Sequence, residues 1–419
     1  MPSCSSGRGA SPSRATSCER PDVSGSGRGP LRDEFEAIVV GLGGIGSGAA
    51  YWLARRFGDR VLGLERFAFG HVNGASQDHS RIIRLSYHRP HYVRLAAQAY
   101  EAWATVETEW GRPLILRTGG IDLWPITATE IPMADYTGAM DACGVAYERL
   151  DADEVMRRWP QWRLDADTVA LYQAAGGIAP PILANEAHRT LAERRGATLL
   201  DQMPVTALRS TGAGVEVDAG GRTFRARTVF LCTDAWTNEL TGQLGTTLPL
   251  TITKEQVTYW ASPHLPNFAP ERFPVWIWMD VPSFYGFPAF GEPGPKGAQD
   301  VGGRPTTPGT RDFAPDPEAF ARLERFMAAR LPTALGPVLY TKTCLYTMPP
   351  DRDFVIDAVP GHPDIHVALG AAHGFKFASL FGRIFSELAA DGATLSDVAP
   401  FRIDRPILRD PDPPTSFMV

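Results

Sequence analysis

The chain has 419 residues, of which 44% are hydrophobic and 21% are charged, a composition typical of a globular protein large enough for two domains. The formal net charge is -6, and no block of lysine or arginine stands out, which argues against a nucleic-acid partner. The cysteines are scattered without C-x-x-C spacing, so the sequence predicts neither a disulfide framework nor a metal site and favours a reducing, cytoplasmic location. No apolar run is long enough to span a bilayer, so no membrane partner is expected.

Residues 1–33 differ in composition from the rest of the chain. They consist mainly of Ser, Gly, Pro and Arg, and a segment with so few large apolar residues cannot bury enough surface to offset its ordering entropy. We therefore expect a disordered tail, and because it lacks an apolar core segment it is not expected to be a secretory signal. Cys4 and Cys18 lie in it and are assigned no role.

The first predicted ordered unit is a strand, a glycine-rich turn, a helix and a second strand. Residues 37–40 form a short apolar run typical of a buried parallel strand. Residues 47–57 have the apolar spacing of a helix, and residues 60–64 are predicted to be the second strand. This order of elements is the context in which a glycine-rich turn binds a dinucleotide.

The glycines of this turn have G-x-G-x-x-G spacing. Gly41 permits a tight turn, Gly43 lets the backbone approach a pyrophosphate, and Gly46 lets the helix pack closely on the strand. Glu65, at the end of the second strand, can accept hydrogen bonds from ribose hydroxyls. The pattern predicts a dinucleotide site, but by itself it does not separate NAD from FAD.

The remaining chain has an interrupted α/β pattern. We expect a helix over residues 92–110, a helix and strand over 180–200, two strands over 222–236, antiparallel strands over 250–290, a helix over 316–330, and a strand, glycine loop and helix over 364–392.

The predicted fold class is α/β, with a Rossmann-like dinucleotide-binding domain built from discontinuous segments and a β-rich, mostly antiparallel substrate domain. The expected bounds are 34–105, 170–245 and 338–405 for the first domain, and 106–169 and 246–337 for the second.

Five stretches together carry a resemblance to a known family. They are IVVGLGGIG, HVNGASQDHSRIIRLSY, YGFPAFGEPGPKG, KTCLYTMPPDRDFVID and AAHGFKF. Over about residues 35–405 the chain resembles the monomeric sarcosine oxidase and N-methyltryptophan oxidase family, a branch of the FAD-dependent amine oxidases of the D-amino-acid-oxidase type. The resemblance implies FAD as cofactor, a small amino acid and O₂ as partners, and a monomer.

Cys344 is the residue for which the resemblance changes the interpretation most. A lone cysteine in an alternating strand is usually a small core residue. The resemblance implies instead that Cys344 forms a thioether to the 8α-methyl carbon of the flavin, a reaction of the nucleophilic thiolate. It further implies that the first of the two domains binds FAD and that Ser80, Val205, Gly374, Phe375 and Lys376 contact the cofactor.

The substrate carboxylate requires fixed cations. Taken alone, Arg81 and Arg84 are more often structural ion-pair partners. The resemblance implies that Arg81 lies against the flavin and binds the substrate carboxylate together with Lys376, while Arg84 is structural support. Tyr285 and Tyr346 match tyrosines that line the substrate pocket in the family, a role compatible with a core position.

Lys296 lies eleven residues after Tyr285, in the stretch GEPGPKGAQD. Without the resemblance it would be read as a solvated loop lysine. In the family the lysine at this spacing lies on the flavin and activates O₂, because a buried ammonium stabilises the negative charge that develops on oxygen. Lys296, Arg81 and Lys376 are therefore the expected catalytic residues.

The sequence also departs from the family pattern. Asp300 stands where sarcosine-oxidising members carry a histidine, and Ser76 and Gln77 stand where they carry histidines too. Ala372 replaces a family glycine. These departures put sarcosine itself in doubt and make Asp300 a candidate substrate contact. Trp278, like Trp276, is expected either to shape a different substrate cavity or to fill the core.

The sequence thus predicts an FAD-dependent oxidase that converts a secondary or cyclic amine of an amino acid to an imine by hydride transfer to flavin N5, with O₂ reduced to H₂O₂. No enzymic general base is nominated. One alternative is a biosynthetic imine-forming oxidase or dehydrogenase of a cyclic or primary amino acid. An alternative of another class is a non-catalytic nucleotide-binding Rossmann protein.

Overall fold

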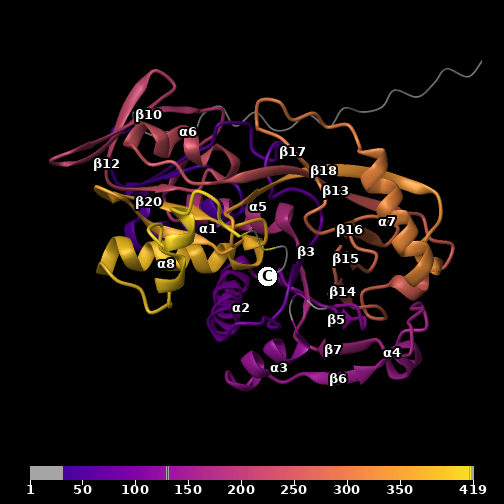
Figure 1. Ribbon diagram of the computed structural model, residues 1–419. Helices are drawn as coiled ribbons and strands as arrows, with labels where there is room; N and C mark the ends of the chain where they lie inside the picture. The colour runs from indigo at the N-terminus through magenta and orange to yellow at the C-terminus, as the bar shows by residue number, and fades with distance from the viewer. Residues whose placement is uncertain (1–31, 129, 131, 415, 417–419) are drawn as a thin grey trace, which may run out of the picture. The chain divides into compact units, whose positions relative to one another are not determined.

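The computed structural model describes residues 32–128, 130, 132–414 and 416, and from Glu34 onward the chain forms one compact unit. The tail predicted for residues 1–33 lies almost entirely outside the described residues. Within the described part, no helix is long and apolar enough to cross a membrane. The unit contains two large β-sheets and a small one, together with the helices that cover them (Figure 1).

The first large sheet contains a parallel core, which is the arrangement expected for a Rossmann-like domain. β1 pairs in parallel with β2 and β12, β2 pairs with β9, and β12 pairs with β20. The residues of β1 and β2 are almost all buried, as expected for strands covered on both faces. The strands of this sheet are β1 (Glu34–Val40), β2 (Val61–Leu64), β9 (Thr198–Leu200), β10 (Val205–Thr211), β11 (Gly214–Ala219), β12 (Arg222–Leu231), β19 (Val355–Val359) and β20 (His362–Leu369).

Helices far apart in the chain lie side by side on this sheet. α1 packs against α8 and α5 (Figure 1). The crossing with α8 is so close that a Cβ at Gly382 would lie 2.3 Å from the Gly48 carbonyl oxygen, which leaves room only for glycine. The helices are α1 (Gly44–Phe57), α2 (Pro90–Trp110), α3 (Met133–Asp141), α4 (Ala152–Arg158), α5 (Pro181–Arg194), α6 (Thr237–Thr241), α7 (Pro317–Arg330) and α8 (Ala378–Asp391), with short 3-10 turns η2 (Asp234–Trp236) and η6 (Gly374–Phe377) among others.

The second large sheet is mostly antiparallel, with β14 and β5 as its parallel pair. Its longest ladder joins β13 to β18 and places Glu255 opposite Cys344. A small sheet of β3 (Arg81–Ile83), β4 (Leu116–Arg117) and β8 (Gly177–Ala179) carries Arg81. The strands of the second sheet are β5 (Gly120–Trp124), β6 (Glu148–Asp151), β7 (Val169–Gln173), β13 (Thr251–Trp260), β14 (Val275–Trp278), β15 (Phe284–Phe287), β16 (Lys296–Gln299), β17 (Arg304–Pro305) and β18 (Val338–Met348).

The predicted α/β fold class is confirmed, with two local corrections. Residues 222–236, expected to form two strands, form the single strand β12 followed by η2, because β12 pairs first with β11 and then continues alongside β1 and β20. The helix expected from Ser47 begins already at Gly44, where the Ser47 amide donates to the Gly43 carbonyl over 2.9 Å.

The strand content also bears on the division into two domains. β7 and β18 both belong to the second sheet, where β7 pairs with β5 and β6 and β18 pairs with β13. The sequence, in contrast, places residues 170–245 and 338–405 in the FAD-binding domain. We propose that the two domains follow the two large sheets, so that residues 169–173 and 338–348 count with the substrate domain.

Candidate active site

Two cavities share a wall. The larger has a volume of about 250 Å³ and is lined by Val40, Leu64 and Cys232, at the carboxyl ends of the parallel strands, the edge where α/β sheets bind ligands. The smaller has a volume of about 120 Å³. Arg81, Tyr346 and Phe375 are among the residues that line both.

The glycine-rich turn leaves room for a phosphate group in the larger cavity. Gly41 has a φ of 85°, and a Cβ there would lie 2.6 Å from the Cys232 carbonyl oxygen. A Cβ at Gly46 would lie 1.7 Å from the Gly41 carbonyl oxygen, so neither position accepts a side chain. Gly43 and Gly44 line the cavity at the first turn of α1, whose amide groups and positive dipole end suit an anion.

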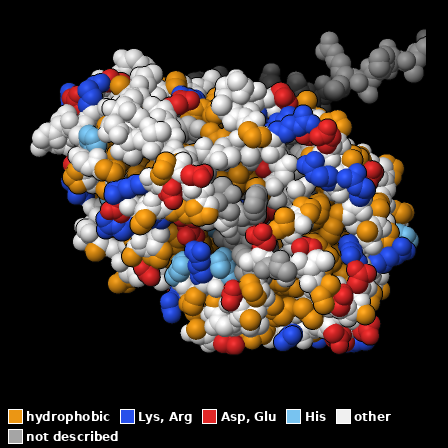
Figure 2. Space-filling view, viewed as in Figure 1, with side chains coloured by type: hydrophobic (Ala, Val, Ile, Leu, Met, Phe, Trp, Pro, Cys, Tyr) orange, Lys and Arg blue, Asp and Glu red, His pale blue; other side chains and the backbone are white. Residues whose placement is uncertain are grey.

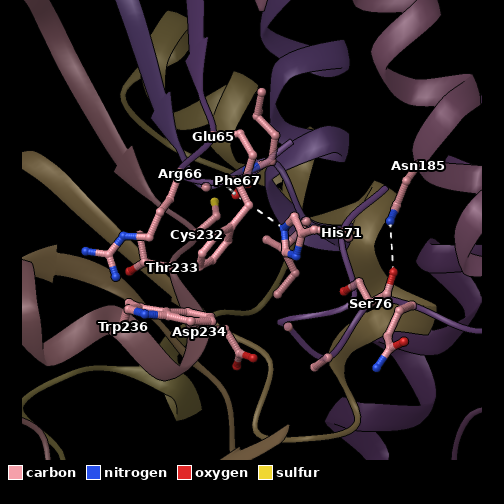
Figure 3. A pocket seen from close by; sticks show the side chains of 18 of the residues that line it. Glu65, Arg66, Phe67, His71, Ser76, Asn185, Cys232, Thr233, Asp234 and Trp236 are labelled. Carbon is pink, nitrogen blue, oxygen red and sulfur yellow. Dashed lines mark hydrogen bonds and ion pairs between the residues drawn. The ribbon is translucent and has the colours of Figure 1, made fainter. Parts of the chain in front are cut away.

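Glu65 is a buried acceptor in the same cavity (Figure 3). Its Oε2 accepts from the Leu42 amide over 2.7 Å, and its Oε1 accepts from the Phe67 amide over 3.0 Å and lies 3.3 Å from His71 Nε2. Burial alone would raise the pKa of Glu65, but these hydrogen bonds outweigh it and hold the pKa below its usual range. Glu65 is therefore an ionised carboxylate, as the predicted ribose contact requires.

The larger cavity fits FAD. The turn at Gly41–Gly44 is free of side chains where the pyrophosphate would lie, and Glu65 is ionised at the predicted ribose end. Val205, Gly374 and Phe375, all expected to contact the cofactor, also line this cavity. Figure 3 adds a residue that the sequence interpretation missed: the Asn185 amide donates to the Ser76 carbonyl over 3.2 Å across the cavity wall.

Lys376 lines the smaller cavity without a direct partner among the described residues. Among the described residues, no hydrogen bond or ion pair engages its ammonium, which lies 5.7 Å from the centre of the Tyr87 ring. Burial, followed by repulsion from the Arg84 guanidinium, lowers the pKa of Lys376 to about 7. An anion bound in this cavity would stabilise the ammonium form.

Arg81 also lines the smaller cavity, and its guanidinium is held by backbone carbonyls. It donates to the oxygens of Ala75, Gln77 and Ser80 over 2.6, 2.7 and 2.8 Å. This orientation is therefore set before any ligand binds. Ser80 itself lines neither cavity, and it acts here through its carbonyl.

Arg84 is neutralised by Asp122. Its Nη1 lies 3.1 Å from both carboxylate oxygens, and the Ser86 hydroxyl donates to the same carboxylate over 2.5 Å. Arg84 nevertheless lines the smaller cavity. The geometry agrees with the supporting role expected for this arginine.

The strand β18 brings Cys344 and Tyr346 to the smaller cavity, and β15 brings Tyr285. The two tyrosine hydroxyls lie 3.3 Å apart. Burial raises the pKa of the Cys344 thiol to about 11, although the Arg81 guanidinium acts in the opposite direction. The cysteine is thus a buried thiol beside the wall that the two cavities share.

Lys296 is buried, but it lines neither cavity. Its Nζ lies 3.0 Å from Asp78 Oδ2, 3.0 Å from the Ser80 carbonyl oxygen and 4.1 Å from the centre of the Phe287 ring. Asp78 lines both cavities. The ammonium predicted to activate O₂ therefore lies behind Asp78, a residue that the sequence interpretation missed.

The remaining predicted substrate contacts divide between cavity and core. Asp300 lines the smaller cavity and forms an ion pair with Arg352. Sequence reasoning missed Arg352, because nothing in a single sequence pairs an arginine with an acid so far away in the chain. Trp278 lies in the core, where its ring packs 5.5 Å from that of Phe326, and its neighbour Ile277 takes the place in the cavity wall. Of the two readings left open for Trp278, the core reading fits this position.

Comparison with known proteins identifies the family. Residues 36–388 match the family described as "DAO: FAD dependent oxidoreductase". The chain belongs to this family. The protein is therefore an FAD-dependent oxidoreductase, which favours an enzyme over a non-catalytic nucleotide-binding protein and FAD over NAD.

Relatives within this family are amine oxidases. The chain is 36% identical to monomeric sarcosine oxidase of Streptomyces avermitilis, over 88% of this chain and 96% of that protein. It is 29% identical to N-methyl-L-tryptophan oxidase of Escherichia coli, over 89% of this chain and 99% of that protein. A solved structure of NikD, described as an unusual amino acid oxidase essential for nikkomycin biosynthesis, matches with a TM-score of 0.77 and 28% identity, over 93% of this chain and 99% of that one.

Proposed function

We propose that the protein is an FAD-dependent oxidase that converts the amine of a small amino acid into an imine and passes the electrons to O₂, which yields H₂O₂. The observation that carries this proposal is the Lys376 ammonium, which lines a cavity adjoining the FAD cavity without a protein partner among the described residues. A buried cation requires a counter-charge, and the carboxylate of an amino acid supplies one. When bound, FAD supplies the two-electron acceptor.

The residues of this chain bind and orient the substrate. Lys376 and Arg81 bind the carboxylate, and because three carbonyls already fix the Arg81 guanidinium, little side-chain freedom is lost on binding. Ile277 and Met279 provide apolar wall for the substrate carbon atoms. Tyr285 and Tyr346 close the polar side of the cavity.

Substrate oxidation tests this proposal directly. The purified protein should be yellow, and a panel of N-methyl, cyclic and primary α-amino acids should contain substrates that bleach the flavin without O₂ and release peroxide in air. Amines that correspond to the same substrates without their carboxylate should react poorly. A flavin that stays oxidised with every amino acid, or decarboxylated amines that react as well as their parent acids, would contradict it.

We further propose that the flavin is covalently attached through Cys344. The proposal is supported by the position of this thiol, which lines the smaller cavity on the same strand as Tyr346, a residue of the wall shared with the FAD cavity. After acid denaturation and centrifugation, the yellow colour of the wild-type protein should stay with the pellet. Cys344→Ser should release it to the supernatant, whereas Cys143→Ser, which alters a cysteine outside both cavities, should not. Flavin in the supernatant of the wild-type protein would show that the cofactor is not covalently bound and that Cys344 is a packing residue.

A biosynthetic imine-forming oxidase remains the second candidate. It is favoured by the similarity to NikD and by Asp300 in the smaller cavity, where the resemblance predicts a histidine for sarcosine oxidation. Faster turnover of cyclic amino acids than of linear N-methyl amino acids would support it. We expect the protein to act as a monomer in the cytoplasm, which size-exclusion chromatography and cell fractionation would test.

A further inference from the structure

An ion pair lies in the wall of the smaller cavity. Arg352 Nη1 donates to Asp300 Oδ2 over 3.0 Å, and both residues line the cavity. The side chain of Arg352 is 3% exposed, whereas that of Asp300 is 24% exposed. The arginine side chain is therefore buried beneath the carboxylate, and Asp300 is the partner that a ligand can reach.

The backbone of both partners is tied to the cavity wall. Arg352 has a φ of 55°, a conformation that residues other than glycine rarely adopt, and its carbonyl accepts from His373 Nε2 over 2.9 Å. His373 lies next to η6, which carries Lys376. The Asp300 amide donates to the Ser283 carbonyl over 2.9 Å. The backbone at Arg352 is consequently linked to the segment that carries Lys376, and the backbone at Asp300 is linked to Ser283 in the cavity wall.

The ion pairs around this wall leave one carboxylate oxygen of Asp300 without a partner among the described residues. Arg84 is compensated by Asp122, and Arg352 is compensated by Asp300. A carboxylate can accept roughly four hydrogen bonds, and the described bond from Arg352 Nη1 goes to Oδ2 of Asp300. Among the described residues, Asp300 Oδ1 has no partner. The cavity thus offers a cation at Lys376 and a hydrogen-bond acceptor at Asp300.

We propose that Asp300, positioned by Arg352, accepts a hydrogen bond from an N–H donor that sarcosine does not carry, either the additional N–H of a primary amine or a donor group on the side chain. This inference rests on the proposed oxidase function and narrows its substrate class to amino acids with such a donor. A substrate with a carboxylate at Lys376 and a donor at Asp300 would satisfy both groups, whereas sarcosine would leave the Asp300 acceptor unpaired when it excludes water from the cavity.

The alternative is that the ion pair is purely structural, so that it stabilises the two segments that carry Asp300 and Arg352 and plays no part in substrate recognition. Removing one partner of a buried pair is destabilising in either case, because it leaves the other charge without compensation, whereas replacing both by apolar residues of similar volume is commonly tolerated. Stability alone therefore cannot separate recognition from bracing. The preference among substrates can, because a brace contributes equally to the oxidation of every amino acid.

The test measures kcat/KM on matched substrates with wild type, Asp300→Asn, Arg352→Met and the double variant Asp300→Leu/Arg352→Met. The substrates are sarcosine and N-methylalanine, their primary counterparts glycine and alanine, and asparagine and lysine as donors on the side chain. Asp353→Asn is the control, since this acid of the same turn bonds to Arg89 and Tyr92 and does not line the cavity.

In wild type, kcat/KM should be about tenfold or more higher for glycine and alanine, or for asparagine and lysine, than for sarcosine and N-methylalanine. The variants should lose about tenfold to a hundredfold of that preference. The comparison of glycine and alanine with asparagine and lysine then tells whether the donor is the amine or the side chain. If a single variant does not fold, the double variant decides. A wild-type preference for sarcosine, or an equal loss on all substrates, would overturn the inference, whereas a flavin that no amino acid reduces would instead refute the oxidase function.

Discussion

Lys296→Met is expected to leave the anaerobic reduction of the flavin by substrate nearly unchanged and to slow its reoxidation by O₂ by a factor of about 10²–10³. The reason is charge. The Lys296 ammonium is almost wholly buried and is held by Asp78 and the Ser80 carbonyl, so it is oriented before oxygen arrives. A fixed buried cation stabilises the negative charge that forms when O₂ accepts electrons, and methionine retains the volume without the charge.

The pH dependence of reoxidation provides a second measurement. Burial lowers the pKa of Lys296 to about 8, although the Asp78 carboxylate acts in the opposite direction. The ammonium is therefore present below about pH 8 and is lost as the pH rises through that value. Wild-type reoxidation should slow over this range, and the Lys296→Met protein should lack this step.

The control must separate charge from folding, because Lys296→Met leaves Asp78 buried without its partner. Lys296→Met/Asp78→Asn removes both charges and should restore stability while reoxidation stays slow. Stopped-flow mixing of the reduced protein with O₂ measures the rate. Reoxidation at the wild-type rate in either variant would show that the lysine is only a structural partner of Asp78.

Lys376→Met is expected to weaken the binding of a carboxylate inhibitor such as methylthioacetate by about tenfold to a hundredfold or more. The ammonium has no protein partner among the described residues, so the inhibitor carboxylate would be its counter-charge. Arg81→Met should weaken binding in the same direction. The perturbation of the flavin spectrum by inhibitor gives the dissociation constant.

The same site predicts a pH effect. The pKa of Lys376 is lowered to about 7 by burial and by Arg84, so the free protein loses this positive charge as the pH rises through that value. Inhibitor affinity should therefore fall above about pH 7, and Lys376→Met should abolish the fall. Lys342→Met is a suitable control, because this lysine lines both cavities but is only partly buried. Equal affinity in the Lys376→Met and wild-type proteins would exclude a role of Lys376 in binding the carboxylate.

The surface charges of the protein are mixed rather than segregated. On the face shown in Figure 2, Lys and Arg side chains alternate with Asp and Glu. The charges on which both predictions depend are instead the buried ones, which the low local dielectric makes stronger and which no surface view displays.

Local patterns determined the elements that line one end of the larger cavity. The glycine spacing at Gly41–Gly46 and the acid at Glu65 lie within one strand, helix and strand, so their geometry follows from neighbours in the chain. The α/β class could be predicted for the same reason, since apolar periodicity is a local property. The roles suggested for Cys344, Arg81 and Lys376 came from a resemblance, and the sequence by itself left them open.

Only the tertiary structure decided which charges compensate one another. Asp78 meets Lys296 across 218 residues, and Asp300 meets Arg352 across 52 residues, distances at which no periodicity or motif carries information. The side of the sheet to which Trp278 points, and the sheet to which β18 belongs, likewise depend on strand pairing rather than on local sequence. The physical reason is that burial turns a charge from a solvated group into one that must find a partner, and the fold alone determines which partner is near.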